Sequence, residues 1–425
     1  MVRLPHALLR SPSARQTPLL KKTKPEAPAS DRPRASNQFL LGLKTAAIAS
    51  SGFVCALVLW EVILRSAVEK SQGVDDHPAL GKIDNAGVMI HTREGFNRTT
   101  LNSLGMRAPE PTPKQPGEYR ILLLGDSFTR ADEVSDGLSF SDRLQTHFVT
   151  EYKKSNRLQY NPSDQFFITA GQSRQITEKV SVVNAGKPSA SPAGYLFASD
   201  FHREKFEPNA TVIQLTEHDF TMDMGDESSE FYLKKTDDTY KAVRNKKFGS
   251  ADPLAQLVTE KVPQLRSLFT LSTLRIGGRN LSAALSSSES DTESTVKRSK
   301  AEEAKLQAED AAMIDWTLKQ LDEKFPNVVI VFIPAMSYLD AGPTSSVSRN
   351  AAIEKRLTES AKSQGIPLIN MRQDFRNHYA KEDTYLKGFS NTLPGEGHLN
   401  AHGHRLVARR LINFFSQPNS PLRQS

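Results

Sequence analysis

The sequence predicts an α/β fold, with a central parallel sheet, helices on both of its faces, and one transmembrane helix before the sheet. Two observations predict the sheet: short apolar runs lack the alternation of a half-exposed strand, and segments of helical character separate them. A third observation, one long uncharged run near the N-terminus, predicts the membrane helix. We therefore expect a three-layer, flavodoxin-like domain behind a single membrane anchor.

Residues 1–37 form a basic tail. They hold eight lysines and arginines against two acidic residues, so they carry +6 of the formal net charge of +7. They also contain six prolines and no long apolar run, and such a segment cannot bury a core. We expect this tail to be disordered, and the rest of the chain to be nearly neutral.

Residues 38–65 are predicted to cross a membrane. Sixteen uncharged residues lie between Lys44 and Glu61, and the apolar flanks extend the span past the ~20 residues that a bilayer requires. Lys44 can extend to the interface, and Trp60 is typical of a headgroup anchor. A buried core helix would be amphipathic, and this segment is not.

The charge distribution predicts the orientation of this span. Basic residues favour the cytoplasmic side, which places the tail in the cytoplasm and residues 66–425 across the inner membrane, in the periplasm or its equivalent. A cleaved signal peptide fits less well, because no A-x-A site follows the apolar run. Cys55 is the only cysteine, so a disulfide framework and a cysteine-rich metal site are excluded within the chain.

The remaining chain divides into a polar connector over 66–116, a domain over 117–416 and a short tail over 417–425. In the domain, the serine-rich stretch 282–300 is predicted to be a flexible surface insertion. The expected buried strands are 119–124, 180–184, 211–215, 328–333 and 366–370. The expected helices are 140–150, 301–325, 350–364 and 401–415.

Ligands bind beyond the carboxyl ends of the strands in such sheets, so the chemistry is expected just after Leu124, Asn184 and Leu215. Gly125-Asp-Ser-Phe128 follows the first of these strands. A serine on a tight strand-to-helix turn exposes its hydroxyl next to backbone N–H groups, which can stabilise an oxyanion. The alternative is that Asp126 or Ser127 only caps a helix.

At this point the sequence resembles the GDSL/SGNH hydrolases, in particular a membrane-anchored branch of the bacterial envelope. Four blocks occur in order from Asn102 to Phe415: Asn102-Ser-Leu-Gly-Met-Arg107 with Gly125-Asp-Ser127, Val183-Asn-Ala-Gly186, Thr216-Glu-His-Asp219 and Gly397-His-Leu-Asn-Ala-His-Gly-His404. The resemblance implies a nucleophile at Ser127 and a catalytic histidine at His398. It also implies an oxyanion hole formed by Ser127, Gly186 and His218, the last in the place of an asparagine.

Two positions depart from the family pattern. The family has an aspartate three residues before its histidine, where this chain has Gly395. Glu396 is our predicted third member of the triad, while Asp383 or a dyad without an acid stay open. At the second position, the imidazole of His218 can donate to an oxyanion as an amide would.

Other polar residues have structural alternatives. Arg107 suits either a carboxylate or sugar ligand, or a structural role that pins the connector to the domain. His402 and His404 are expected to pack or cap, since no acidic cluster at suitable spacing supports a metal site beside His398. We expect neither a metal nor a cofactor.

The leading hypothesis is a membrane-anchored serine esterase or O-acyltransferase acting on O-acyl groups, such as acetyl, of a cell-surface or exported polysaccharide. The alternative is a weakened member of the fold that serves as a carbohydrate-binding or assembly subunit of an envelope complex. Positive charge confined to a tail beside a membrane span argues against nucleic acid as a partner. The expected partners are the membrane and an acylated carbohydrate.

Overall fold

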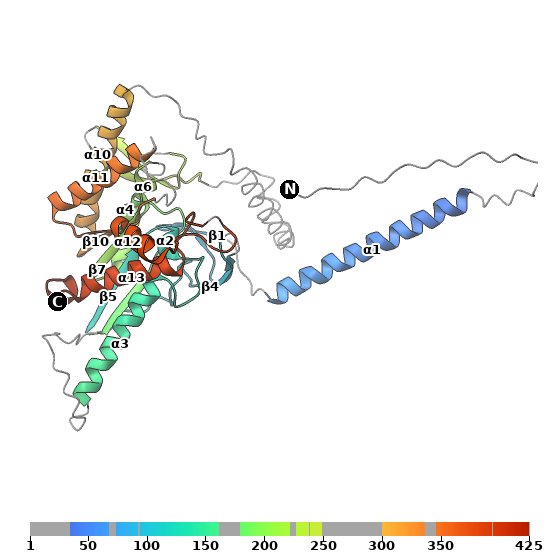
Figure 1. Cartoon of the computed structure of the whole chain (residues 1–425), viewed down its shortest axis with the longest axis horizontal. Coiled ribbons are helices and arrows are strands. Elements are labelled where there is room, and N and C mark those ends of the chain that lie inside the picture. Colours follow the sequence, from blue (N-terminus) through green and yellow to red (C-terminus); the bar gives the residue numbers. More distant parts are fainter. Residues whose placement is uncertain are drawn as a thin grey trace, which may run out of the picture. The chain divides into compact units, whose positions relative to one another are not determined.

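The protein is described here by a computed structural model that covers residues 35–67, 74–91, 94–160, 179–221, 227–237, 239–248, 300–335, 346–392 and 394–424. The chain divides into two units, Met1–Trp60 and Glu61–Ser425 (Figure 1). The predicted insertion over 282–300, apart from Lys300, and residues 1–34 of the predicted tail lie outside the described residues.

Helix α1, Ala35–Ala67, confirms the helix expected over 38–65. Its segment Leu41–Leu59 has a mean hydropathy of 1.7, and none of that segment is buried. At 1.5 Å per residue, 19 residues extend about 28 Å, close to the ~30 Å thickness of a bilayer core. Within the described residues α1 is the one helix with the length and composition to cross a membrane.

The central sheet has five parallel strands in the order β11-β10-β7-β5-β6. Their bounds are β5 Glu118–Leu124, β6 Lys179–Asn184, β7 Ala210–Leu215, β10 Val328–Phe332 and β11 Leu368–Asn370. All five expected strands are therefore present. The strand order reverses between β5 and β7, and ligands of doubly wound sheets bind at such a reversal.

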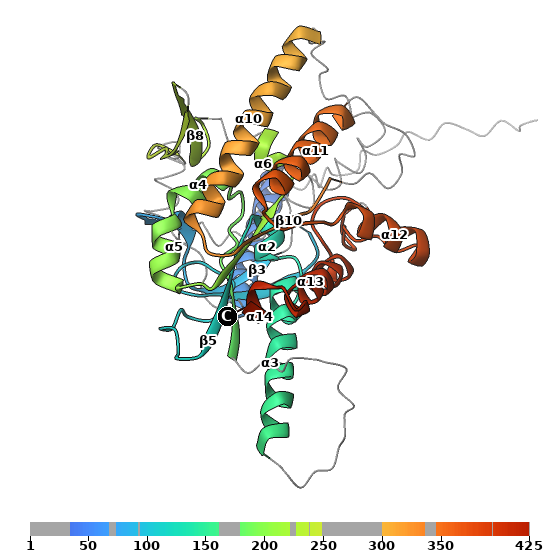
Figure 2. The same ribbon diagram turned by 90° about the vertical axis from the view of Figure 1, so that its left-hand side faces the viewer.

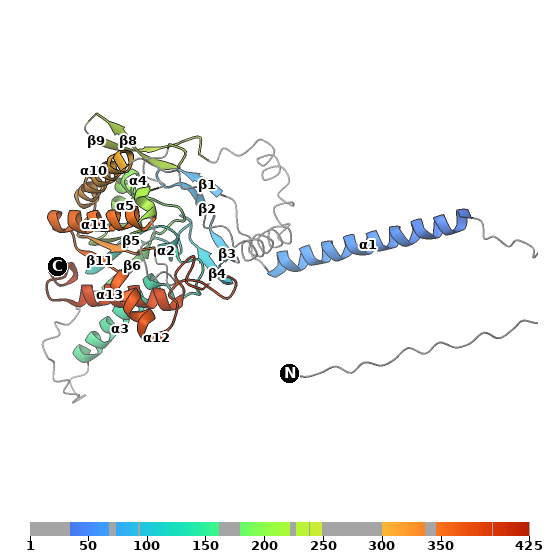
Figure 3. The same cartoon turned by 45° about the horizontal axis from the view of Figure 1, so that its top comes forward.

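Side chains that alternate along the strands divide the core into two layers. Leu122, Ile213 and Phe332 point to one face, which is covered by α4 (Pro192–Phe197), α5 (Ser199–Phe206), α10 (Lys300–Lys324) and α11 (Ser346–Gln364). Leu123 and Val212 point to the other face, which is covered by α3 (Phe140–Tyr160), α12 (Arg372–Glu382) and α13 (Ala401–Ser416). Figure 3 shows the two sets on opposite sides of the sheet, as the three-layer prediction requires.

The helices follow the apolar pattern of the sequence. The four predicted helices correspond to α3, α10, α11 and α13, although α3 continues to Tyr160. In α11 the side chains of Ile353, Leu357 and Ala361 are all buried, which confirms the apolar face that their four-residue spacing predicts.

Residues 66–116 are not the plain connector that we expected. They contain two antiparallel hairpins, β1 (Val74–His77) with β2 (Gly81–Asp84) and β3 (Gly87–His91) with β4 (Asn97–Leu101). Arg130 holds the first hairpin to the domain through Asp84, at 2.5 Å. The polar composition hid these strands because they are short and only partly buried.

Smaller elements complete the domain: α2 (Ser127–Arg130), α6 (His218–Thr221), α14 (Pro421–Gln424) and the hairpin of β8 (Phe231–Thr236) with β9 (Thr239–Arg244). The hairpin packs beside α10, where Trp316 Nε1 donates to Thr239 Oγ1 at 3.1 Å (Figure 2). The segment 417–425 is more than a tail, because α14 buries Leu422 in the core.

Candidate active site

The turn after β5 presents Ser127. Gly125 is required there, because a Cβ atom at its position would lie 1.9 Å from Thr129 Oγ1. Asp126 caps α2 by accepting from the Phe128 N–H at 2.8 Å, as the alternative interpretation of the motif anticipated for this residue. Gln214 of β7 accepts from Asp126 N at 3.2 Å and from Thr129 Oγ1 at 3.0 Å, so two neighbouring strands fix the turn.

Ser127, His398 and Glu94 form a continuous hydrogen-bonded chain. His398 Nε2 lies 2.7 Å from Ser127 Oγ, and His398 Nδ1 lies 2.8 Å from Glu94 Oε2. The same carboxylate oxygen accepts from the His398 backbone N–H at 2.7 Å. An ionised Glu94 fixes the proton on Nδ1, which leaves Nε2 free to accept the serine proton.

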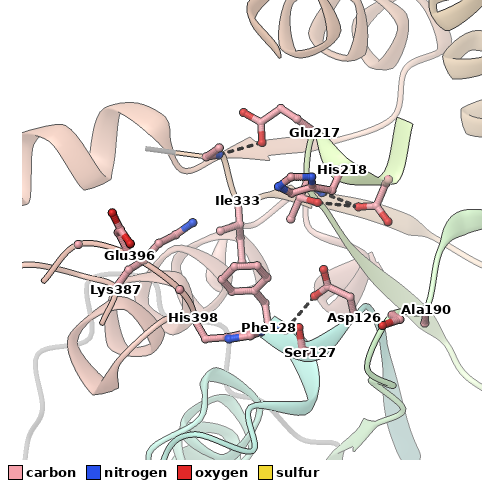
Figure 4. A pocket seen from close by; sticks show the side chains of 16 residues that line it. Asp126, Ser127, Phe128, Ala190, Glu217, His218, Ile333, Lys387, Glu396 and His398 are labelled. Atoms are coloured by element: carbon pink, nitrogen blue, oxygen red, sulfur yellow. Dashed lines mark hydrogen bonds between the residues drawn. The ribbon is translucent and has the colours of Figure 1, made fainter. Parts of the chain in front are cut away.

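The prediction that Glu396 pairs with His398 is wrong, since Glu94 occupies Nδ1. Glu396 lies at the wall of the pocket with an exposed side chain (Figure 4). Glu94 comes from the turn between β3 and β4, some 300 residues earlier in the chain. Gly397 makes room for it, because a Cβ atom there would lie 2.4 Å from Glu94 Oε2. Asn391 fastens the turn by accepting from Gly95 N at 2.6 Å.

A second carboxylate, Glu133, stands on the same side of the histidine. Its Oε1 lies 3.5 Å from His398 Nδ1 and 3.8 Å from His91 Nε2. Its Oε2 and His91 Nε2 are buried and have no hydrogen-bond partner within the described chain. Asn97 of β4 holds this segment by donating to the backbone oxygens of Asp132 and Val134.

Burial, hydrogen bonds and neighbouring charges set the pKa values of Glu94, His398 and Glu133. Burial raises the pKa of Glu94, but hydrogen bonds and charge from His398 outweigh it and hold that pKa below its usual value. Burial lowers the pKa of His398, yet the hydrogen bond to Glu94 and the charge of Glu133 outweigh it and raise that pKa above 6.5. Burial raises the pKa of Glu133 to about 7, so Glu94 is the permanently charged partner at neutral pH.

A cavity of about 450 Å³ opens over Ser127 and His398. His218 belongs to its wall, as the resemblance implied, and Figure 4 shows the ring on the turn that follows β7. Asp219 shapes this turn by accepting from Thr216 N at 2.6 Å and from Thr216 Oγ1 at 3.2 Å. His218 is an exposed residue in the wall of this cavity.

Gly186 does not line this cavity. Its backbone N–H donates to Asn184 Oδ1 at 3.0 Å, and a Cβ atom on Gly186 would lie 2.4 Å from the backbone nitrogen of Arg130. The glycine therefore allows α2 to approach the loop after β6, and the predicted oxyanion role is wrong. Ser189, further along the same loop, does line the cavity, with a φ of +57° that non-glycine residues adopt rarely.

The upstream motif has a structural role. Asn102 Oδ1 accepts from the N–H groups of Leu104 and Met106, which closes a turn. Arg107 is buried and donates to the Ala131 carbonyl oxygen. Its Nη2 also donates to Asp136 Oδ1 at 3.0 Å. The arginine thus pins the loop that carries Glu133, the second of the two roles considered for it.

His402 and His404, the other histidines of the last block, do not line the cavity. His404 is buried against the Phe140 ring, and burial lowers its pKa to about 3. His402 is exposed and lies 3.0 Å from Arg405. In the part of the chain that the structure describes, no three His, Cys, Asp or Glu side chains are grouped to hold a metal ion.

The sequence analysis missed two residues that the structure places at this site, Glu94 and Ser189. Glu94 is one of several acids in a polar stretch, and only the Gly-His step at 397–398 hinted that something approaches the histidine closely. Ser189 has a side chain where the backbone conformation favours glycine, so a search for glycine overlooks it.

No protein-family model and no curated protein matches the chain. Among solved structures, it is similar to a lipolytic G-D-S-L family protein from Veillonella parvula DSM 2008, with 11% identity over 70% of this chain and 99% of that one, and a TM-score of 0.33. It is also similar to a lipase/acylhydrolase from Enterococcus faecalis, with 13% identity over 70% of this chain and 95% of that one, and a TM-score of 0.33. A two-domain esterase active on acetylated mannans shows 12% identity over 73% of this chain and 51% of that one, with a TM-score of 0.34.

Proposed function

We propose that the chain is a serine hydrolase of SGNH type that uses Ser127, His398 and Glu94 as its catalytic triad. The observation that carries this proposal is the unbroken hydrogen-bonded chain from Ser127 Oγ through the imidazole to the Glu94 carboxylate. It lies at the carboxyl end of the sheet beside the strand-order reversal, and it opens into a cavity of about 450 Å³.

In this mechanism Ser127 Oγ attacks an ester carbonyl while His398 Nε2 takes the serine proton. The developing imidazolium is stabilised by Glu94, and the oxyanion by the His218 side chain with the main chain of Ser127 and Ser189. His398 then gives the proton to the departing alcohol, which leaves an acyl group on Ser127. Water or a sugar hydroxyl next accepts that acyl group, so hydrolysis and O-acyl transfer share the intermediate.

The substrate class follows from the location that we propose for the domain. With α1 in the inner membrane and the basic tail in the cytoplasm, residues 66–425 face the periplasm. A domain held there meets polymers of the envelope, which supports O-acyl groups of a cell-surface or exported polysaccharide as substrates. A reporter enzyme fused after Ser425 should be active only outside the cytoplasm, and activity inside it would refute this orientation.

The alternative, a weakened carbohydrate-binding or assembly subunit, drew on two departures from the family pattern. The first was the lack of an acid at position 395, and Glu94 supplies that acid from another segment. Of the two departures, only the replacement of an asparagine by His218 still favours a carbohydrate-binding or assembly subunit. The observed contacts of Ser127 and His398 favour the enzyme.

A fluorophosphonate probe tests the proposal directly, because it reacts with an activated serine. We expect labelling of the full chain in detergent and no labelling of Ser127→Ala. Ser416→Ala is the matched control, since it removes an exposed serine hydroxyl outside the cavity and should still be labelled. An unlabelled wild-type chain that is folded would overturn the assignment.

A further inference from the structure

Lys387 is a buried cation in the wall of the cavity, and the triad does not use it. Its side chain is 8% exposed, and its Nζ lies 4.9 Å from the centre of the Phe128 ring, next to the nucleophile in sequence. Its backbone is tied to the histidine loop: Gly395 N donates to Lys387 O at 3.1 Å, and Gly388 N donates to His398 O at 3.1 Å. The backbone of Lys387 is therefore fixed beside the histidine loop, and its ammonium group lies over the Phe128 ring.

No described residue accepts a hydrogen bond from this ammonium group or lies within ion-pair distance of it. Figure 4 shows the amine directed into the cavity. The nearby carboxylates are engaged with other donors. Glu217 accepts from Ala335 N at 2.8 Å and lies 3.3 Å from Arg372, while Asp126 accepts from Phe128 N at 2.8 Å. Burial lowers the pKa of Lys387, which reflects the cost of keeping this charge away from water.

A buried ammonium has three donors and needs acceptors, since an unsatisfied charged group costs free energy. The Phe128 ring offsets part of that cost through a cation–π contact but accepts no conventional hydrogen bond. A molecule that enters the cavity can supply such an acceptor. A carboxylate satisfies the donors and also balances the charge, whereas a hydroxyl satisfies only the donors.

We propose that Lys387 binds a carboxylate of the ester substrate, so that the enzyme acts on acid-bearing acyl carbohydrates. This inference rests on the proposed esterase function and names the substrate class for the same site. The carboxylate has two sources, an O-acylated uronic acid or an acyl group that itself ends in a carboxylate. In both cases the substrate anion lies beside Phe128 while the ester carbonyl faces Ser127.

Matched ester pairs test this specificity in the full chain. One pair is an O-acetylated methyl glucuronoside and the corresponding glucoside; the other is p-nitrophenyl hemisuccinate and p-nitrophenyl butyrate. We expect wild type to prefer the charged member of one pair by about 10- to 100-fold in kcat/KM, as for hydrogen bonds to a charged group. The pair that shows the preference identifies the source of the carboxylate.

The preference should fall to about one in Lys387→Met and survive in part in Lys387→Arg, which keeps the charge. Ester hydrolysis by wild type without preference in either pair would overturn this inference and leave the esterase function standing.

Binding to Ser127→Ala separates the two proposals further, because it needs no catalysis. We expect calorimetry to show tighter binding of the acetylated glucuronoside, or of succinate, than of the neutral glucoside, and Lys387→Met in the same background to abolish the difference. If Ser127→Ala shows this difference in binding while the wild-type chain hydrolyses none of the esters, the result would support the anion site and refute the esterase function. Equal binding of all these ligands would refute the anion site.

Discussion

The proposed active site has two halves that differ in how they are built. Ser127, Ser189 and His218 follow β5, β6 and β7, so the sheet itself brings them to one edge. His398 and Glu94 lie on loops outside the sheet, and each depends on contacts between distant segments. The comparison shows that the sheet topology places the proposed nucleophile and oxyanion groups, whereas loop packing places the proposed base and its acid.

The largest effect should come from the acid of the loop half. Glu94→Gln keeps the shape but removes the charge that stabilises the imidazolium, so kcat should fall by about 10²- to 10⁴-fold. Glu396→Gln is the matched control and should change kcat less than about threefold, under ~0.7 kcal/mol of barrier. Steady-state kinetics on a chromogenic ester measures both. A large loss in Glu396→Gln with none in Glu94→Gln would reverse our assignment of the acid.

The sheet half is probed through His218. If its imidazole donates to the oxyanion, His218→Ala should lower kcat by roughly 10²- to 10³-fold with little change in KM. His218→Asn should recover part of the loss because an amide restores a donor. His402→Ala, at an exposed histidine outside the cavity, should leave kcat unchanged. Full activity of the His218→Ala enzyme would make His218 a structural residue.

The dependence of the loop half on close packing is tested by a pair of glycines. Gly397 and Gly365 have φ values of +74° and +73°, so alanine should cost each about 1–2 kcal/mol of folding stability. Only at Gly397 does the added Cβ meet Glu94, while nothing lies within 4 Å at Gly365. We expect Gly397→Ala to lower kcat about tenfold or more through the displaced acid, and Gly365→Ala to keep it. Thermal unfolding with kinetics separates the two effects, and equal kcat values would contradict the packing argument.

The smallest expected effect is a shift in pH dependence. His398 works as a base only when Nε2 is unprotonated, and its raised pKa places the acid limb of kcat/KM at a higher pH than an ordinary histidine would. Removing an anion near the ring lowers that pKa and moves the limb to lower pH. Glu133→Gln should shift it slightly and Glu94→Gln more, because Glu133 is farther away and only partly ionised near pH 7. A limb that moves upward in either variant would refute this account.

Glu133 should also make the folding stability of the protein depend on pH. Its pKa rises on folding to about 7, so the folded state keeps a proton that the unfolded chain has lost. Stability contributed by this group therefore falls as pH rises from about 4.5 to 7. Glu133→Gln should flatten that fall in a series of denaturant titrations, and an unchanged slope would show that Glu133 is ionised in the fold.

The sequence by itself determined the layered fold and the half of the site that rests on it. Apolar runs of five or six residues mark buried strands because hydrophobic burial follows local composition, and the carboxyl ends of parallel strands share one edge. The location of Ser127 just after the first strand could be predicted from these facts, whereas the roles of His218 and His398 came from the resemblance of their blocks.

The tertiary structure alone decided the acid, the oxyanion loop and the role of residues 66–116. Glu94 reaches His398 because a hairpin of modest burial folds back across the domain, and no local pattern encodes a contact over 304 residues. Gly186 and Ser189 follow the same strand, but only Ser189 lines the cavity, because Gly186 lies where α2 approaches Asn184 closely. Such contacts depend on which distant segments pack together, and composition, periodicity and spacing do not carry that information.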